Sequence, residues 1–267
     1  MRHLHTPVRP KKSLGQHFLN DLTIAKRIAD TVDTPPDDIP ILEVGPGTGV
    51  LTQFLAQKER PLTAVELDTE SVAYLRDHFP TLHVLHDDFL HMDLSTLYDG
   101  PFVLTGNYPY NISSQIFFRV VQHRDCIPLC TGMIQREVAE RLAASPGSKT
   151  YGVLSVLIQA WYHVQLLFTV PPTAFTPPPK VQSAVVSLQR NDITNLGCDE
   201  KLFRRVVKQV FTQRRKMLRV SLRQVFDGER PRPDLFPDDL LTLRPEQLSV
   251  QDFVDLTNRI TQQSSHP

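Results

Sequence analysis

The sequence predicts an α/β fold built on an open sheet, followed by a small helical domain. Short apolar runs that are typical of buried strands alternate with helical segments between residues 41 and 190. The first of these runs leads directly into a glycine-rich turn, and open α/β sheets bind their ligands at such strand ends. From residue 198 onward, apolar residues recur at helical spacing.

The chain is long enough for more than one domain, and its charge is uneven. Its 267 residues suffice for one large and one small domain, and the formal net charge is zero. Nine Lys or Arg and no Asp or Glu nevertheless lie between Lys201 and Arg223. We expect an N-terminal arm over 1–21, a sheet domain over 22–190 and, after a linker, a helical domain over 198–267.

The cysteines and the N-terminus indicate a reducing compartment. Cys126, Cys130 and Cys198 form no even framework and no CxxC pair, which favours free thiols and argues against a metal site. The first 20 residues are basic and polar and lack the apolar core of a signal peptide. The longest apolar tract, 151–170, carries Gln and His, so we expect buried elements there instead of a membrane span. These features predict a cytoplasmic protein.

The N-terminal arm leads into the first predicted helix. Lys11–Asp21 begins with basic residues and continues as an aromatic and apolar turn. The helix is predicted over Leu22–Val32, because apolar residues recur on one face, and Asn20 or Asp21 is its expected cap.

The first predicted strand, Ile41–Val44, is followed by Gly45, Gly47 and Gly49. Glycines here let the backbone approach a ligand closely, and a helix that starts near Val50 offers free amides. A dinucleotide site needs GxGxxG, and Val50 breaks that pattern. The ExGxGxG form is instead typical of S-adenosylmethionine sites, so Gly45 and Gly47 are predicted cofactor contacts.

An acid ends each of the next two predicted strands. Glu66 lies near the end of the strand predicted over 62–68, about 20 residues after the first glycine, where a carboxylate accepts hydrogen bonds from both ribose hydroxyls. Asp88 follows a helix over 70–78 and a strand over 82–85, and it is the better candidate than Asp87 for binding an adenine amine. The alternative for each acid is a solvated position at a strand end or in a loop.

The fourth predicted strand, Phe102–Leu104, delivers the most informative stretch, Asn107-Tyr108-Pro109-Tyr110. The Asn107 side chain and the Tyr108 carbonyl are acceptors that could grip a flat amino group, and Pro109 stiffens the turn. A base amine is a poor nucleophile because its lone pair is delocalised into the ring, so such acceptors help to alkylate it. Tyr110 offers a face for a flipped-out base. The alternative is a polar turn whose tyrosine is only core.

The elements that follow complete the predicted sheet domain. A helix over 112–122, capped by Asn111 or Ser113, precedes a strand over 129–133 and a helix over 135–142. The next elements are a helix after 152, a strand over 164–168 and a last strand over 183–188. Between these strands, a proline-rich segment holds Phe175 on a stiff scaffold, where it could close over the target base or act as a hydrophobic plug.

The C-terminal part combines apolar and basic helix faces. Lys201–Phe211 and Gln213–Arg223 are predicted helical, and 240–260 should add one or two closing helices. Arg214, Arg215 and Lys216 are candidate phosphate contacts, although a charge run is often only a solvated face.

With these residues in place, the chain resembles the KsgA family of small-subunit ribosomal RNA adenine dimethyltransferases. The resemblance rests on six short segments in the same order along nearly the whole chain: Lys12–Leu19, Glu43–Gly49, Glu66–Asp68, Gly106–Ser113, Phe175–Val186 and Gln213–Lys216.

The resemblance implies a Rossmann-like class I S-adenosylmethionine-dependent methyltransferase domain with a small all-α C-terminal domain. Such enzymes transfer four methyl groups onto the N6 atoms of two adjacent adenosines in a hairpin near the 3′ end of the 16S RNA, within a late 30S assembly intermediate. We expect a monomer, no membrane partner and no metal. The cofactor contacts carried over are His17, Leu19, Gly45, Glu66, Asp88 and Asn107.

Two positions depart from the family pattern. His17 stands where Asn is frequent, so its cofactor contact could use the ring or only the backbone. Tyr108 stands where Leu is frequent, but the family uses the carbonyl of that position. The catalytic group is then Asn107, Tyr108, Pro109, Tyr110 and Phe175.

Three rival functions remain open from the sequence. One is a related enzyme that dimethylates an adenosine of 23S RNA and confers macrolide resistance, and another is a non-catalytic assembly or transcription factor. An NAD-dependent dehydrogenase is disfavoured by the glycine spacing.

Overall fold

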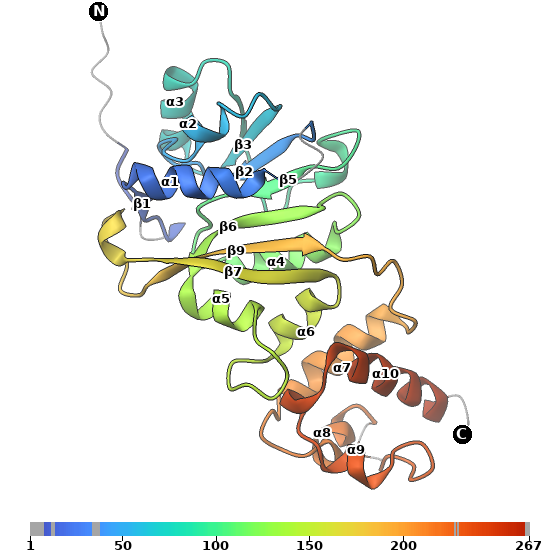
Figure 1. The fold of residues 1–267 in the computed structure, drawn as a ribbon. Helices are drawn as coiled ribbons and strands as arrows, with labels where there is room; N and C mark the ends of the chain where they lie inside the picture. The colour runs from blue at the N-terminus through green and yellow to red at the C-terminus, as the bar shows by residue number, and fades with distance from the viewer. Residues whose placement is uncertain (1–7, 12–13, 34–37, 227, 229, 265–267) are drawn as a thin grey trace, which may run out of the picture. The chain divides into compact units, whose positions relative to one another are not determined.

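The computed structural model describes residues 8–11, 14–33, 38–226, 228 and 230–264 (Figure 1). Residues 1–7, Lys12 and Ser13 of the predicted arm lie outside this range. The chain divides into two compact units, each described here by itself. The sheet unit comprises residues up to 139 together with 163–190, and the helical unit comprises 140–162 together with the residues from 191 onward.

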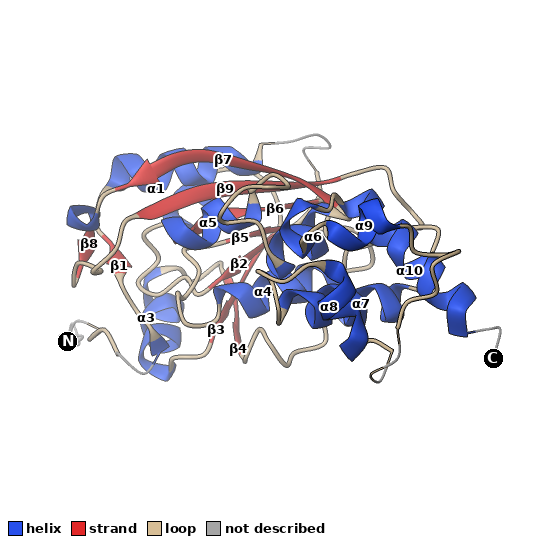
Figure 2. Cartoon of the chain, turned by 90° about the horizontal axis from the view of Figure 1, so that it is seen from below, coloured by secondary structure: helices blue, strands red, loops and turns tan. Residues whose placement is uncertain are grey.

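The sheet unit is organised around one seven-stranded sheet with a Rossmann-like strand order. Strands β2, β3, β4, β5 and β6 are parallel neighbours, whereas β9 runs antiparallel to β6. In Figure 2, β6, β9 and β7 lie side by side. The spatial order is β4 (His83–His86), β3 (Leu62–Glu66), β2 (Ile41–Val44), β5 (Val103–Thr105), β6 (Leu129–Gln135), β9 (Ser183–Arg190) and β7 (Tyr162–Val170). Each of these strands was predicted to within a few residues.

Helices α1 (Leu22–Ala29) and α2 (Thr52–Leu55) pack with one face of the sheet (Figure 1). Helix α1 buries Ala25, Ile28 and Ala29, and a 3₁₀ turn, η2 (Asp30–Val32), extends it to the predicted end. Its cap is Asp21, whose carboxylate accepts from two backbone N–H groups at 2.9 and 3.1 Å.

Two further helices connect the parallel strands. Helix α3 (Thr69–His78) begins after Asp68, whose side chain accepts from Ser71 N. Helix α4 (Ser113–Gln122) lacks a side-chain cap, so the prediction that Asn111 or Ser113 caps it is wrong. Ser113 lies inside the first turn, where its hydroxyl donates to the Tyr110 carbonyl at 3.3 Å. A short 3₁₀ turn, η3 (Leu94–Thr96), lies between β4 and β5.

A two-stranded sheet that the sequence did not predict joins the N-terminal arm to the proline-rich segment. Strand β1 (Phe18–Leu19) pairs antiparallel with β8 (Phe175–Thr176), and the two lie side by side in Figure 2. Asn20 N donates to the carbonyl of Ala174 in the 3₁₀ turn η4 (Pro172–Ala174), at 2.8 Å. The arm is therefore fixed to a segment that lies far along the chain.

The helical unit is built around α7 (Glu200–Phe211), whose apolar face is buried. The ring of Phe211, its last residue, lies tilted against that of Phe253 in α10 (Val250–Ser264), with a centroid distance of 5.8 Å. The predicted basic helix is interrupted, because residues 212–216 form turns and a bend between α7 and α8. The elements are α6 (Val153–Gln159), α7 (Glu200–Phe211), α8 (Leu218–Ser221), η5 (Leu222–Gln224), α9 (Asp238–Thr242), η6 (Pro245–Gln247) and α10 (Val250–Ser264).

Segment 140–162 belongs with the helical unit, although the sequence analysis placed it inside a continuous sheet domain. Helix α6 has contacts with α7 and α10, and α5 (Arg136–Leu142) crosses the boundary between the units. The physical reason is that α6 is apolar on much of its surface and finds its partners among helices far along the chain. Within the described residues, no helix is both long and apolar enough to span a membrane.

Candidate active site

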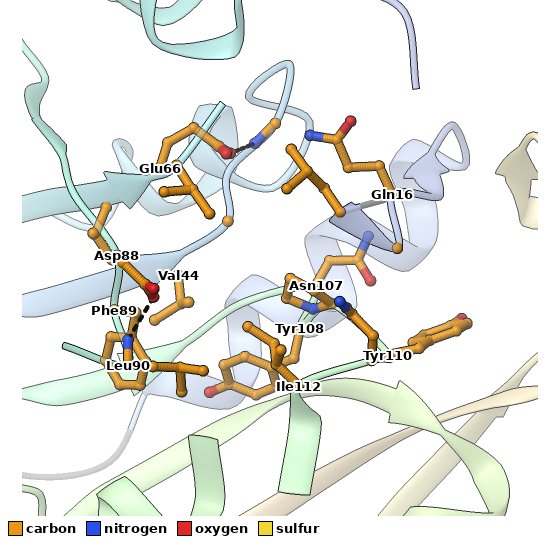
Figure 3. A pocket seen from close by; sticks show the side chains of 18 of the residues that line it. Gln16, Val44, Glu66, Asp88, Phe89, Leu90, Asn107, Tyr108, Tyr110 and Ile112 are labelled. Atoms are coloured by element: carbon orange, nitrogen blue, oxygen red, sulfur yellow. Dashed lines mark hydrogen bonds between the residues drawn. The ribbon is translucent and has the colours of Figure 1, made fainter. Parts of the chain in front are cut away.

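The main cavity lies where the carboxyl ends of four parallel strands meet. It encloses about 900 Å³, including the part that opens to solvent, and the strand order reverses there between β2 and β5. Figure 3 shows Glu66 and Asp88 on one side of this cavity and Asn107 and Tyr110 on the other. The lining comes from residues 14–18, 44–45, 47, 65–67, 87–90 and 107–112.

The glycine turn after β2 adopts backbone conformations that other residues rarely use. Gly45 and Gly47 have φ values of +68° and +58°. A Cβ at Gly47 would lie 2.9 Å from Phe18 Cε1, so the arm packs directly on this turn. Both glycines line the cavity, where the bare backbone allows a ligand to approach closely.

Glu66 at the end of β3 is held by two backbone amides. Its carboxylate accepts from Gly47 N at 3.0 Å and from Asp68 N at 2.9 Å, and the residue is only 6% exposed. Burial raises the pKa of Glu66, and these two hydrogen bonds act in the opposite direction. The carboxylate is thus fixed at the cavity wall, with lone pairs left for hydroxyl donors.

Two acids follow β4, and both line the cavity. The Asp88 carboxylate accepts from Leu90 N at 2.9 Å and lies 2.7 Å from His91 Nδ1. Asp87 is exposed and accepts from Asp88 N at 2.7 Å. Phe89 is 4% exposed, so a ligand at this wall would meet an aromatic surface beside fixed carboxylates.

Asn107 presents an oriented amide. Its Nδ2 donates to the His17 carbonyl at 3.0 Å, which turns Oδ1 to the other side. Within the described part of the chain, neither Oδ1 nor the Tyr108 carbonyl receives a hydrogen bond. Two acceptors therefore remain available on neighbouring residues. Pro109 follows them in the cavity wall.

The two tyrosines of this turn have different surroundings. The Tyr108 ring is 1% exposed and its hydroxyl donates to the Thr131 carbonyl at 2.8 Å, so its side chain is core. Burial also raises the pKa of Tyr108 well above its ordinary value. Tyr110 is half-buried, lines the cavity and is hydrogen-bonded to Ser183 through its hydroxyl. The structure brings Tyr110, and not the Tyr108 ring, to the face where a base could stack.

Phe175 and Leu19 are placed in the core instead of the cavity wall. Phe175 is 3% exposed and pairs through β8 with Leu19, which is 4% exposed. This geometry does not support the prediction that Phe175 closes over a base, because its ring is packed into the hydrophobic cluster beneath α1. Leu19 instead lines a smaller adjoining cavity of about 320 Å³ that it shares with Gly45 and Asn107.

Contacts of Lys11 that the sequence did not predict hold the arm over the site. Lys11 is hydrogen-bonded through Nζ to Asp68 and forms an ion pair with Glu70 at 3.1 Å. The Lys11 amide also donates to Gln16 Oε1 at 2.8 Å, and Gln16 lines the cavity. The only available signal was the run of basic residues before Leu14, which carries no information about its partners.

In the helical unit, the three predicted phosphate contacts separate into two kinds. Arg214 is ion-paired with Glu246 at 2.9 Å and donates to the Ser148 carbonyl at 3.2 Å. Arg215 and Lys216 are exposed. Arg214 is therefore engaged within the fold, which a sequence run of basic residues cannot reveal.

All three cysteines are free thiols, as predicted, and the described residues contain no cluster of His, Cys, Asp and Glu that could hold a metal ion.

The cavity fits a nucleoside cofactor on several independent grounds. The Gly45–Gly47 backbone is open to close approach, Glu66 presents a fixed carboxylate, and Phe89 and Asp88 provide an aromatic and polar wall. These features lie on three successive strand ends, as in nucleotide-binding α/β folds. The residues present thus match the needs of S-adenosylmethionine.

Comparison with known proteins gives a consistent result. A model of the family described as "Ribosomal RNA adenine dimethylase" matches residues 8–262. The chain is 64% identical to ribosomal RNA small subunit methyltransferase A of Phocaeicola vulgatus, over 95% of this chain and 90% of that protein. It is 62% identical to the protein of the same name from Bacteroides thetaiotaomicron, with coverages of 95% and 94%.

Solved structures that resemble the chain over nearly its whole length include the following two. A dimethyladenosine transferase from Plasmodium falciparum is 22% identical, with a TM-score of 0.79 and coverages of 93% and 98%, which shows a shared fold. The 23S rRNA methyltransferase ErmE is 26% identical, with a TM-score of 0.68 and coverages of 91% and 99%. From the match over residues 8–262 and these relatives, the chain belongs to the ribosomal RNA adenine dimethylase family.

Proposed function

We propose that this protein dimethylates N6 of two adjacent adenosines in the 3′-terminal hairpin of 16S ribosomal RNA. The observation that carries the proposal is that two unpaired acceptors, Asn107 Oδ1 and the Tyr108 carbonyl, share one cavity with the glycine turn and Glu66. The relatives named small-subunit methyltransferases are 62–64% identical to this chain, against 26% for the 23S enzyme, which favours the small-subunit RNA as substrate.

The methyl donor is S-adenosylmethionine, which supplies a methyl group on a positively charged sulfur that is already an activated leaving group. Gly45 and Gly47 would allow its nucleoside to approach the backbone, and Glu66 would accept from its ribose hydroxyls. Asp88 would bind the adenine amine, and Phe89 would offer an aromatic surface to the ring. Leu19 contributes through the smaller adjoining cavity.

The acceptor side of the site prepares the target amine for attack. The two N–H groups of an unmethylated adenine N6 donate to Asn107 Oδ1 and to the Tyr108 carbonyl, which draws the nitrogen toward a tetrahedral geometry. Tyr110 stacks on the flipped base. Much of the rate then comes from holding two reactants in line, with no covalent enzyme intermediate. After the first transfer the amine is bulkier, so the open side of the cavity must admit it again.

The helical unit is proposed to bind ribosomal RNA through its basic surface, with Arg215 and Lys216 as phosphate contacts. Ribosomal RNA is the substrate of this enzyme family. We further propose that the substrate is a late 30S assembly intermediate, that the enzyme acts as a monomer and that it works in the cytoplasm. Free thiols agree with that location.

The test is methyl transfer from labelled S-adenosylmethionine to purified small and large ribosomal subunits that lack their adenosine dimethylations, with the product nucleoside identified. We expect dimethyladenosine in the small subunit alone. Label in the large subunit would transfer the protein to the 23S type, and cofactor binding without any label would make it an assembly factor. Asn107→Ala should abolish transfer while the protein stays folded; near-normal turnover would remove Asn107 from the mechanism.

A further inference from the structure

His17 lies where three segments of the sheet unit meet. Its backbone belongs to the arm, its carbonyl accepts from Asn107, and its ring Nδ1 lies 2.8 Å from the Pro177 carbonyl. Its ring also stacks on Tyr110, with a centroid distance of 5.4 Å and an interplanar angle of 29°. One residue thus touches both the catalytic turn and the proline-rich segment.

The carbonyl of His17 determines which end of the Asn107 amide faces the substrate. A primary amide has a donor end and an acceptor end, and only the donor end can face a carbonyl. Bound to His17, the amide presents Oδ1 to the cavity, which suits an incoming amine that donates N–H. A flipped amide would place its own NH₂ against the NH₂ of the base, and neither group could accept.

The ring of His17 supports Tyr110 from one side. Because the Pro177 carbonyl can only accept, Nδ1 carries the proton and donates, which fixes the plane of the ring. Tyr110 is fixed at its other end by the hydrogen bond to Ser183. The ring that is to stack on the target base is therefore held by a hydroxyl contact and by a second aromatic plane.

We propose that His17 is a positioning residue for methyl transfer, which orients Asn107 with its carbonyl and holds Tyr110 with its ring, and that its side chain does not bind the cofactor. This proposal rests on the proposed function, because it takes Asn107 and Tyr110 as the groups that hold the target adenine. It also answers why a histidine can stand where asparagine is frequent: its ring is turned toward Tyr110 and the proline-rich segment.

Three substitutions separate the roles of the side chain. His17→Ala removes both the ring and the donor, His17→Phe keeps an aromatic plane without the donor, and His17→Asn keeps a donor without the plane. For each variant we would measure the cofactor Kd by calorimetry, and kcat and KM with undermethylated small subunits. Thermal unfolding would exclude loss of the fold.

We expect His17→Ala to leave the cofactor Kd within about twofold of wild type and to lower kcat/KM for the subunit about tenfold, which is the size of one aromatic stacking contact. His17→Phe should recover more of this loss than His17→Asn. A cofactor Kd that weakens tenfold or more in His17→Ala, or a full rescue by His17→Asn alone, would overturn the proposal.

The role of the carbonyl is tested with Asn107→Asp, which keeps acceptors at that position but cannot donate to His17. We expect kcat to fall about a hundredfold, because a carboxylate facing the carbonyl loses its fixed orientation. Turnover close to wild type would show that this hydrogen bond is not needed.

Wild type assayed in parallel distinguishes failure of the proposed function from failure of the proposed role of His17. If wild type itself forms no dimethyladenosine in the small subunit, the proposed function fails, whatever the His17 variants do.

Discussion

Glu43 is a carboxylic acid buried within the parallel sheet. It lies on β2, is 1% exposed and accepts from the Thr52 hydroxyl at 2.7 Å. Burial raises the pKa of Glu43 from 4.5 to about 8; the Thr52 hydrogen bond opposes this shift and repulsion from Glu66 adds to it. At neutral pH the group is therefore mostly protonated, next to the glycine turn of the candidate cofactor site.

Glu43→Gln should stabilise the fold increasingly as the pH rises. The folded protein binds the Glu43 proton more tightly than the unfolded chain, so this residue costs stability as pH rises from 4.5 to about 8. A glutamine cannot titrate. The difference in free energy of unfolding between variant and wild type should grow by about 1.4 kcal/mol per pH unit in this window and level off above it.

Urea unfolding at several pH values between these limits measures this difference. Glu59→Gln is the matched control, because Glu59 is exposed. A pH-independent difference for Glu43→Gln would contradict the burial argument.

At the scale of single residues, the sequence predicted where some residues lie and missed others for a physical reason. The place of Glu66 and Asn107 in the cavity wall could be predicted because each lies at or just after the end of a parallel strand, and parallel strands end at one edge of the sheet. The core position of Phe175 and the ion pair of Arg214 could not, because both depend on partners far along the chain.

The turn that carries Asn107 and Tyr108 is an element fixed to the neighbouring strand β6. Tyr108 N donates to Met133 O at 3.0 Å, Met133 N donates to Gly106 O at 2.9 Å, and the Tyr108 hydroxyl adds a bond to β6. A Cβ at Gly132 would lie 2.4 Å from the Gly106 oxygen and 2.6 Å from Tyr108 Cε2. Close packing against a glycine thus lets a tyrosine occupy this position.

Tyr108→Phe should reduce turnover, whereas Tyr98→Phe should not. Each substitution removes a tyrosine hydroxyl that donates to a strand carbonyl, Thr131 O at 2.8 Å for Tyr108 and Ile41 O at 3.2 Å for Tyr98. We expect each to cost about 1 kcal/mol in urea unfolding, the usual value of one hydrogen bond. Only Tyr108→Phe should lower kcat, because only its turn carries Asn107. Equal kcat values in the two variants would show that the hydroxyl does not position the turn.

The N-terminal arm is the second element that shapes the site, through Lys11. The nearly buried Asp68 carboxylate has its pKa raised by burial, but the hydrogen bonds from Lys11 and Ser71 outweigh this and lower it overall. Asp68 N also donates to Glu66, so Lys11 attaches the arm next to the proposed ribose acceptor.

Lys11→Met should weaken cofactor binding severalfold in calorimetry, because residues 14–18 of the arm line the cavity and lose this attachment. Lys58→Met is the control, since Lys58 forms ion pairs with Asp30 and Asp33 and does not line the cavity. If both variants bound the cofactor like wild type, the contacts of Lys11 would have no role in cofactor binding.

Element by element, local patterns predicted the helices and strands well and their partners poorly. The strands of the sheet follow from apolar runs. The β1–β8 pair was missed because each strand has two residues, too short for any periodic signal. The break between α7 and α8 was missed because basic residues suit helices and turns alike.

For the whole molecule, zero formal net charge conceals a basic segment that the fold divides into structural and exposed residues. Arg214 joins Glu246 and the Ser148 carbonyl within the helical unit. Arg215 and Lys216 follow it in an exposed turn. Sequence alone treats the three as equivalent, whereas their surroundings predict different phenotypes.

The double variant Arg215→Ala/Lys216→Ala should weaken binding to undermethylated small subunits and leave thermal unfolding unchanged. Each lost phosphate contact should reduce the slope of log K against log salt concentration by about 1, so we expect a total change of about 2.

Arg214→Ala should lower the unfolding temperature and leave the salt slope unchanged, because it removes the guanidinium partner of Glu246 and no phosphate contact. Binding titrations over a range of salt concentrations, with unfolding curves for both variants, measure these effects. If Arg214→Ala alone changed the slope, Arg214 would be an RNA contact despite its ion pair, and if the double variant left the slope unchanged, the RNA would bind the helical unit elsewhere or not at all.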